Sequence, residues 1–300
     1  MNEWDQDTYQ PYEYPPEVTR KIRRRERRAQ FFSKILPPDK PVVNLVLFIL
    51  TFFSTYLVGG IAYCLSIMGI LLAHEMGHYL MCRKHGVPAT LPYFIPFPFP
   101  MLNPFGTLGA VIRMDSRIPN RKVLFDIAVA GPLAGLVITL PVIYFGLQNS
   151  EVVLRSSLGP ETLFLGESLL FKFMSKLAVP DLTSDMDIML NPMAFAGWAG
   201  LFVTSLNLLP IGQLDGGHVL YSLFGRRVQK AYIFLIAVFA AVCVVLYPGW
   251  ALLILLLVFF GYKHPPPQDD FTELDPRRRL IGFGMLVIFV ISFTPVPFKF

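Results

Sequence analysis

The sequence predicts an α-helical polytopic membrane protein with about six to seven transmembrane helices and a re-entrant β-hairpin. Of its 300 residues, 54% are hydrophobic and only 16% are charged, whereas about a quarter of a soluble domain is charged. The apolar residues fall into runs long enough to cross a bilayer, and the basic residues lie mostly on one side of those runs. Composition, run length and charge asymmetry together exclude an ordinary soluble domain of this size.

Residues 1–40 are expected to form a cytoplasmic basic arm. Seven of the residues in 20–28 are Lys or Arg, and a basic cluster directly before an apolar run is typical of a topology signal that stays in the cytoplasm. Attraction to anionic lipid head groups is a compatible second role. Because the cluster adjoins a membrane span, we expect no nucleic-acid partner. The polar character of the arm also predicts that there is no cleavable signal peptide.

The uncharged run 41–73 is too long to cross the bilayer as one straight helix. Its 33 residues would extend about 50 Å as a helix, against a hydrocarbon core of roughly 30 Å. Gly59-Gly60 is the natural break, because glycine weakens a helix interior. We therefore expect one span at about 42–58 and a second at about 61–82.

The next apolar stretch cannot be helical, because six proline residues lie between 88 and 104. Non-helical backbone at membrane depth is tolerated only where it is buried in protein or lines a wet cavity. The sequence therefore predicts a re-entrant loop over 88–115 that contains a short hairpin around 103–112.

Further apolar runs follow this loop. A third span is expected at about 123–147, and the acidic segment 148–191 is expected to be the one sizeable loop outside the membrane, on the extracytoplasmic side. The remaining spans are expected at about 192–211, 231–247, 250–262 and 280–296. The runs on either side of Pro248-Gly249 leave two alternatives open, either two full spans or one irregular pair.

The distribution of Lys and Arg orients these spans. With the N-terminus in the cytoplasm and the spans alternating in direction, 22 of the 26 Lys and Arg residues fall on the cytoplasmic side, as the positive-inside rule requires. We therefore expect a multi-pass integral membrane protein with a cytoplasmic N-terminus. Beyond the arm, it divides into a membrane core over 41–225 and C-terminal transmembrane helices over 226–300.

The second expected span carries the sequence His-Glu-Met-Gly-His at 74–78. On a helix, His74 and His78 lie one turn apart on the same face. Two imidazoles so placed can hold one zinc ion, and Glu75 beside them can take a proton from the attacking water. The alternative is a pair of histidines that only pack or hydrogen-bond. Ionisable residues in a membrane span are rare and usually mark function, which favours the metal site.

A second polar motif closes the fourth expected span, with the sequence N-L-L-P-I-G-Q-L-D-G-G-H at 207–218. The second and fourth spans both run toward the cytoplasm, so the two motifs lie on the same side of the membrane. Catalytic zinc takes three protein ligands and keeps a fourth position open. Asp215 would complete a set of two His and one carboxylate, although spacing alone does not exclude His218.

Other residues near these motifs are less suitable ligands. His85 lies about 10 Å beyond His78 along the helix axis, too far to share one ion. Cys82 is expected to be packing, and Asp126 is expected to pair with a nearby Arg or to cap a helix. The three cysteines form no C-x-x-C pair, and no disulfide framework is expected.

An H-E-x-x-H span, a G-P-x-x-G span at 131–135 and N-x-x-P-x-x-x-L-D-G at 207–216 follow one another in this order. In this combination, over about 60–225, the sequence resembles the site-two protease family of intramembrane zinc metalloproteases. The resemblance implies Asp215, ahead of His218, as the third zinc ligand. It also implies that Asn207 positions the substrate or stabilises the oxyanion.

The sequence is similar to a compact form of that family. Many members insert a PDZ domain between the last two motifs, but 136–206 must hold a span, a loop and a span and leaves no room for one. No nucleotide-binding regulatory domain is expected after the last span. We therefore expect no regulatory region that would indicate a particular substrate.

The resemblance implies a zinc metalloendopeptidase that cleaves transmembrane segments of other membrane proteins, in regulated intramembrane proteolysis. Zinc would polarise the scissile carbonyl, while Glu75 takes a proton from water and delivers it to the leaving amine. The expected partners are a single-span membrane-protein substrate and the lipid bilayer. The sequence does not decide whether an upstream protease acts first.

An extended substrate needs backbone partners, because unpaired peptide groups are costly in a bilayer. We expect them in the apolar strand Gly106, Thr107, Leu108, Gly109, Ala110 and Val111, where glycine lets another backbone approach closely. The substrate would add to this edge as an extra strand. The alternative is a hairpin that only plugs the cavity.

Two other functions fit parts of the sequence. A metal transporter or sensor could use the same His and Asp ligands, but it predicts polar residues across the whole bilayer. The outer halves of the expected spans offer almost none. A catalytically inactive membrane scaffold is disfavoured by the intact Glu75.

Overall fold

The computed structural model describes residues 40–99, 101–115, 117–159, 162–251, 254–255 and 266–299, with the side chains of 229–231, 233 and 242–244 left aside. The fold is mostly helical, and two of the described helices are long and apolar enough to cross a membrane, α2 (Pro41–Lys84) and α3 (Arg121–Gln148). The expected arm and most of the expected span 250–262 lie outside the described residues. The total number of spans stays a prediction.

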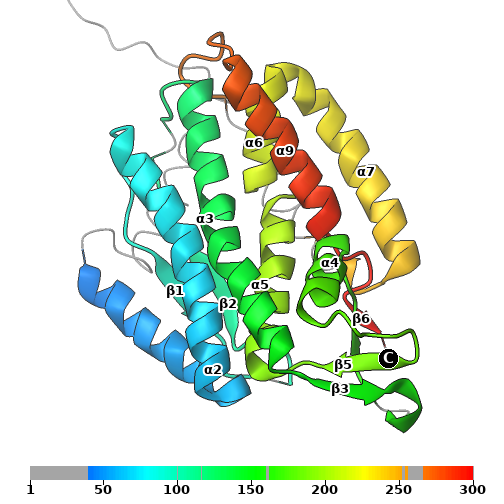
Figure 1. The fold of residues 1–300 in the computed structure, drawn as a ribbon. Coiled ribbons are helices and arrows are strands. Elements are labelled where there is room, and N and C mark those ends of the chain that lie inside the picture. The colour runs from blue at the N-terminus through cyan, green and yellow to red at the C-terminus, as the bar shows by residue number, and fades with distance from the viewer. Residues whose placement is uncertain are drawn as a thin grey trace, which may run out of the picture.

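Helix α2 has a kink where the sequence predicts a break. Gly59 and Gly60 have non-helical backbone angles, and the φ of Gly60 is 68°, in the left-handed region that favours glycine. The kink separates an outer first half from a second half that packs against α3 and carries His74 and His78 (Figure 1). The predicted division of this run into two segments is confirmed.

The proline-rich stretch forms an antiparallel hairpin of β1 (Tyr93–Pro96) and β2 (Thr107–Val111). The predicted hairpin bounds, around 103–112, were wrong, because they include only the turn and the second strand. Proline is tolerated at the end of an edge strand, so Pro96 closes β1 without preventing its pairing. The hairpin packs against α2, where the Ser54 hydroxyl donates to the Gly106 carbonyl at 2.7 Å and the Tyr63 hydroxyl donates to the Phe105 carbonyl at 3.0 Å.

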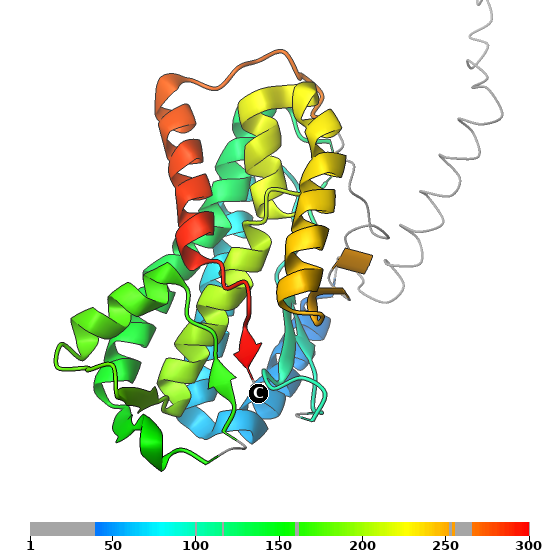
Figure 2. The ribbon, with the colours of Figure 1, turned by 90° about the vertical axis from the view of Figure 1, so that its right-hand side faces the viewer.

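The segment between α3 and α5 (Pro192–Asn207) is folded. It contains β3 (Glu151–Leu154), η1 (Arg155–Ser157), β4 (Phe164–Leu165), α4 (Leu169–Ala178) and β5 (Met186–Met189). Strands β3 and β5 pair with each other, and β4 pairs with the C-terminal strand β6 (Phe298–Lys299), as Figure 2 shows. Helix α5 ends at Asn207, four residues before the predicted end, because Pro210 cannot continue it.

The last described elements are α6 (Asp215–Phe224), η2 (Gly225–Arg227), α7 (Val228–Leu246) and α9 (Pro276–Ser292). Helix α9 begins and ends four residues earlier than the predicted span 280–296. Asp275 caps its N-terminus, and its hydrogen bonds with the Arg278 side chain and backbone lower the pKa of its carboxyl to about 2. A core of packed aromatic rings, including Trp198 and Phe202 with centroids 5.5 Å apart, joins α5 to the hairpin and β6.

Candidate metal centre

Two imidazoles face each other on the second half of α2. His74 and His78 are one helical turn apart, both are buried, and their Nε2 atoms lie 3.2 Å apart. The ring centroids are separated by 4.9 Å with the rings nearly perpendicular. The predicted placement on one helical face is therefore correct.

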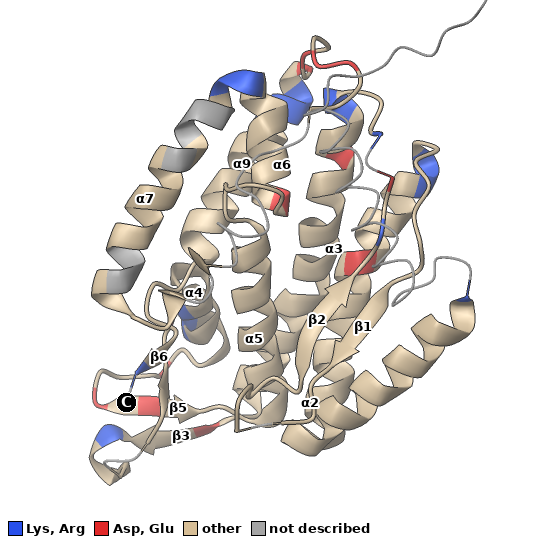
Figure 3. Cartoon of the chain, turned by 180° about the vertical axis from the view of Figure 1, so that it is seen from behind, with Lys and Arg blue, Asp and Glu red and all other residues tan. Residues whose placement is uncertain are grey.

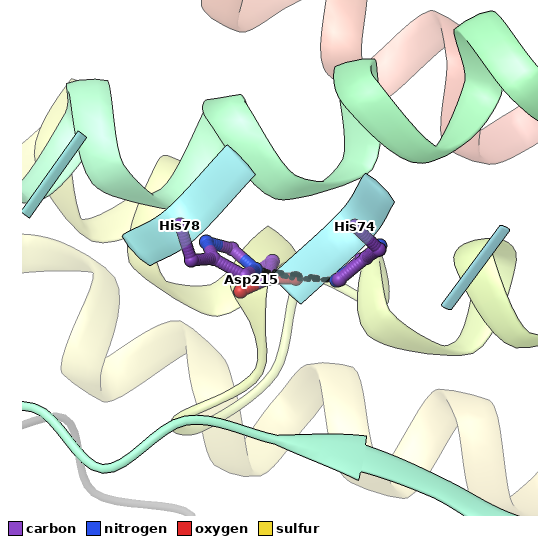
Figure 4. Close-up of side chains that lie close together, drawn as sticks. All are labelled: His74, His78 and Asp215. Carbon is purple, nitrogen blue, oxygen red and sulfur yellow. Dashed lines mark hydrogen bonds and ion pairs between the residues drawn. The ribbon is translucent and has the colours of Figure 1, made fainter. Parts of the chain in front are cut away.

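Asp215 reaches the same point from another element. Its Oδ2 lies 3.3 Å from Nε2 of His74 and 3.3 Å from Nε2 of His78. Figure 4 shows the three side chains close together. The chain turns after α5 and begins α6 at Asp215, with Gly216 packed so tightly that an added Cβ would lie 1.9 Å from the Leu208 carbonyl oxygen. This close approach of the backbone, which only glycine permits, carries the Asp215 carboxylate to the histidines.

The three donor atoms fit a tetrahedral metal ion. Two atoms that each lie about 2.0–2.1 Å from a four-coordinate zinc are about 3.3–3.4 Å apart, and the separations here are 3.2, 3.3 and 3.3 Å. Among the described residues, His74, His78 and Asp215 form the group of ligand atoms close enough to hold one ion. His218 does not join this group.

Helix α3 contacts the imidazole of His78 at Nδ1, the ring nitrogen that does not face Asp215. Nδ1 of His78 lies 2.8 Å from the Ile127 carbonyl oxygen. A carbonyl can only accept, so Nδ1 carries the proton and the Nε2 lone pair is free to bind a metal. An added Cβ at Gly131 would lie 2.1 Å from Nε2 of His78. The first glycine of the G-P-x-x-G motif thus makes room for a ligand ring.

We expect Gly131→Ala to weaken zinc binding by about 10- to 100-fold, the usual effect of disturbing a group that orients a ligand, because its methyl group would displace the His78 ring. Gly69→Ala is the matched control, since an added Cβ there meets nothing within 4 Å. Zinc content of the two purified variants, measured over a series of chelator-buffered zinc concentrations, tests this. Equal zinc affinity in both would contradict the role assigned to Gly131.

Glu75 and Asn207 both lie beside the three donors. Glu75 is buried next to His74, and its carboxylate is faced by the backbone N–H of Ile112, directly after β2. The Asn207 amide nitrogen lies 3.4 Å from Nε2 of His74. The contact of Ile112 with Glu75 could not be found from sequence, because it depends on how the hairpin docks on α2.

The residues set aside as ligands have other partners. His85 Nε2 lies 3.0 Å from Asp126 Oδ2, and the Arg278 guanidinium donates to both Asp126 oxygens at 2.7 Å. The expected pairing of Asp126 with an Arg is confirmed. Cys82 is buried, with its sulfur 4.0 Å from the Met114 sulfur, as expected for a packing residue.

The predicted substrate strand has one unpaired edge. Of the described strands, only β1 pairs with β2. Leu108 and Val111 are 59% and 41% exposed, whereas Thr107 is buried and its hydroxyl donates to the Ile95 carbonyl. The end of β2 lies at Glu75, and its start lies against the first half of α2.

A helical, apolar scaffold with a buried His–His–Asp donor set beside a glutamate is the arrangement of a metallopeptidase centre. A family model described as "Peptidase family M50" matches residues 62–247, and the chain belongs to this family. This confirms the resemblance drawn from the motifs.

Related proteins carry consistent names. The chain is 29% identical over 246 residues to "Probable zinc metalloprotease EGY2, chloroplastic" of Oryza sativa subsp. indica, covering 80% of this chain and 44% of the relative. It is 31% identical over 239 residues to "Probable zinc metalloprotease EGY1, chloroplastic" of Arabidopsis thaliana, covering 77% and 42%. The chain thus spans less than half the length of these curated relatives.

Proposed function

We propose that this protein is an intramembrane zinc metalloendopeptidase that cleaves transmembrane segments of other membrane proteins. The observation that carries the proposal is the buried triangle of His74, His78 and Asp215 donors beside Glu75. The family match favours peptide hydrolysis over the transport or sensing of a metal. The test is cleavage of a tagged single-span membrane protein by the purified chain in liposomes, with Glu75→Gln as the inactive control. A wild-type chain that leaves every peptide bond intact would overturn the proposal.

His74, His78 and Asp215 would hold the zinc, which when bound polarises the scissile carbonyl and the attacking water. Glu75 takes one proton from that water and delivers it to the amine that leaves when the peptide C–N bond breaks. The Asn207 amide nitrogen, which lies 3.4 Å from Nε2 of His74, would donate to the substrate carbonyl oxygen. Burial of this group of side chains limits bulk water at the reacting bond.

The site lies near the cytoplasmic side in this proposal. Most of the Lys and Arg residues that the structure describes gather at the end of the molecule where α3 and α7 begin (Figure 3). Basic residues are retained in the cytoplasm, so this end faces the cytoplasm, and the folded segment between α3 and α5 lies at the opposite end (Figure 2).

An unwound substrate adds to the unpaired edge of β2 in this proposal. Backbone groups alternate between the two edges of a strand. The carbonyl of Arg113 accepts from the Thr90 N–H on the β1 side, whereas the Ile112 N–H points to Glu75. By this alternation Ala110 also presents its N–H away from β1. A substrate strand along this edge would run directly to the catalytic glutamate.

Ala110→Pro should therefore lower cleavage by about 10- to 100-fold, the effect of losing one hydrogen bond to an extended substrate in a dry site, while zinc content and Tm stay near wild type. Val111→Pro is the control, because its N–H points toward β1 and its loss should lower Tm as well. Proline at the other positions of 107–112 completes the scan of this strand. Unchanged cleavage by Ala110→Pro, or loss of cleavage only where Tm falls, would rule out strand addition at this edge.

A further inference from the structure

A pocket with a volume of about 790 Å³ lies at the end of the molecule where α3 begins. This volume is within the usual range of small-molecule sites. Its walls come from the start of α3, the turn from α6 through η2 into α7, the loop before α9 and the first turns of α9. None of its lining residues belongs to the candidate metal centre. We refer to it as the Arg121 pocket.

Arg121 is a buried cation that has no carboxylate partner among the described residues. Its side chain is only 8% exposed, and its Nε and Nη2 atoms donate to the Ser222 carbonyl oxygen at 3.0 and 2.6 Å. Nη1 faces Gly225, at 3.4 Å from where a Cβ would lie. A buried charge is costly unless a counter-charge compensates it. Because the guanidinium forms no ion pair with a described carboxylate, an anion in this pocket would be strongly stabilised.

The other charged groups of the pocket leave an excess of positive charge. The two acidic residues are already paired, Asp270 with Arg226 and Glu273 with Arg279. Arg227 is exposed and forms no ion pair with a described residue. Arg121 and Arg227 are therefore the two cations available to a ligand.

Exposed aromatic rings surround these cations. Phe224 and Phe283, with ring centroids 6.3 Å apart, are 46% and 50% exposed, and Phe271 is 91% exposed. Aromatic side chains next to basic ones are typical of the interface between lipid and water, and basic pockets between helices on the cytoplasmic side accept lipid head groups. We propose that the Arg121 pocket binds the phosphate of an anionic phospholipid, an inference that rests on the membrane orientation given above.

The phosphate would bind the free face of the Arg121 guanidinium and the Arg227 side chain, since guanidinium groups match phosphate oxygens in charge and geometry. The acyl chains would lie along the exposed apolar face of α9, where Leu280 and Val287 are 75% and 58% exposed. A free phosphate ion would use the same two arginines but would gain nothing from the rings and the helix face.

The test is a titration of the full chain in detergent micelles with phosphatidylglycerol or phosphatidylcholine, with bound lipids counted by native mass spectrometry. We expect one saturable site for phosphatidylglycerol, about tenfold weaker in Arg227→Gln, as for loss of one charge-assisted contact, and absent in Arg121→Gln. Arg83→Gln is the matched control, because Arg83 is an exposed basic residue at the cytoplasmic end of α2 outside the pocket. Arg227→Gln keeps the test valid if Arg121→Gln lowers Tm.

Equal weakening by Arg83→Gln and Arg227→Gln, or equal binding of phosphatidylcholine, would reduce the effect to general attraction by a basic surface and overturn the site. Displacement of phosphatidylglycerol by millimolar inorganic phosphate would show that the pocket binds the free ion and would overturn the proposed lipid site. Glu75→Gln should bind the lipid as wild type does, so this result and the outcome of the protease assay are independent.

Discussion

Glu75→Gln is expected to lower cleavage by several orders of magnitude while the zinc content and the fold stay as in wild type. Glutamine has nearly the same shape as glutamate and can still turn an amide oxygen toward the Ile112 N–H, but it cannot take a proton from water. General acid–base catalysis alone contributes about 10²- to 10⁴-fold, and here both water activation and proton delivery depend on the same carboxylate.

Cleavage of the tagged single-span substrate in liposomes measures this loss, and zinc content and Tm are measured on the same preparation. Glu151→Gln, an exposed substitution of the same kind in β3, should keep full activity. Turnover of Glu75→Gln close to that of wild type would refute the proposed mechanism.

Asp215→Ala should lose both bound zinc and activity, whereas His218→Ala should keep its zinc. The Asp215 carboxylate lies 3.3 Å from both imidazole donors, while His218 is outside the group of three donors. Removal of a direct ligand should lower zinc affinity by more than the roughly 10- to 100-fold that results from disturbing a group that orients a ligand. His74→Ala and His78→Ala should resemble Asp215→Ala.

Metal analysis of the purified variants over buffered zinc concentrations distinguishes the two candidates for the third ligand. His85→Ala is a further control, because that imidazole pairs with Asp126 and lies outside the three-donor group. Full zinc in Asp215→Ala together with loss in His218→Ala would reverse the assignment.

The sequence predicted those features that depend on local chemistry. Two histidines four residues apart on a helix must share a face. Gly59-Gly60 breaks the apolar run whatever the two halves of the helix pack against. The order of the motifs along the chain indicated that Asp215 belongs with the histidines. Their side-chain distances required the structure.

Features that depend on contacts between distant segments were not predictable in the same way. The first hairpin strand is short and ends in a proline, and only its pairing with β2 identifies it as a strand. The pairing of β4 with β6 joins residues more than a hundred positions apart. The packing of Gly131 against His78 likewise depends on the rotation of α3 relative to α2, which helical periodicity does not fix.

The backbone N–H of Ile112, directly after β2, faces the Glu75 carboxylate, so the strand proposed to hold substrate adjoins the residue proposed to transfer the proton. A change in β2 would therefore move the general base as well as the docking edge. In kinetic terms, such a change alters kcat together with KM, so affinity and turnover are not separable at this strand. A poor substrate that pairs only partly with β2 would then bind more weakly and would also be cleaved more slowly once bound. A single contact would in this way discriminate between substrates at two steps.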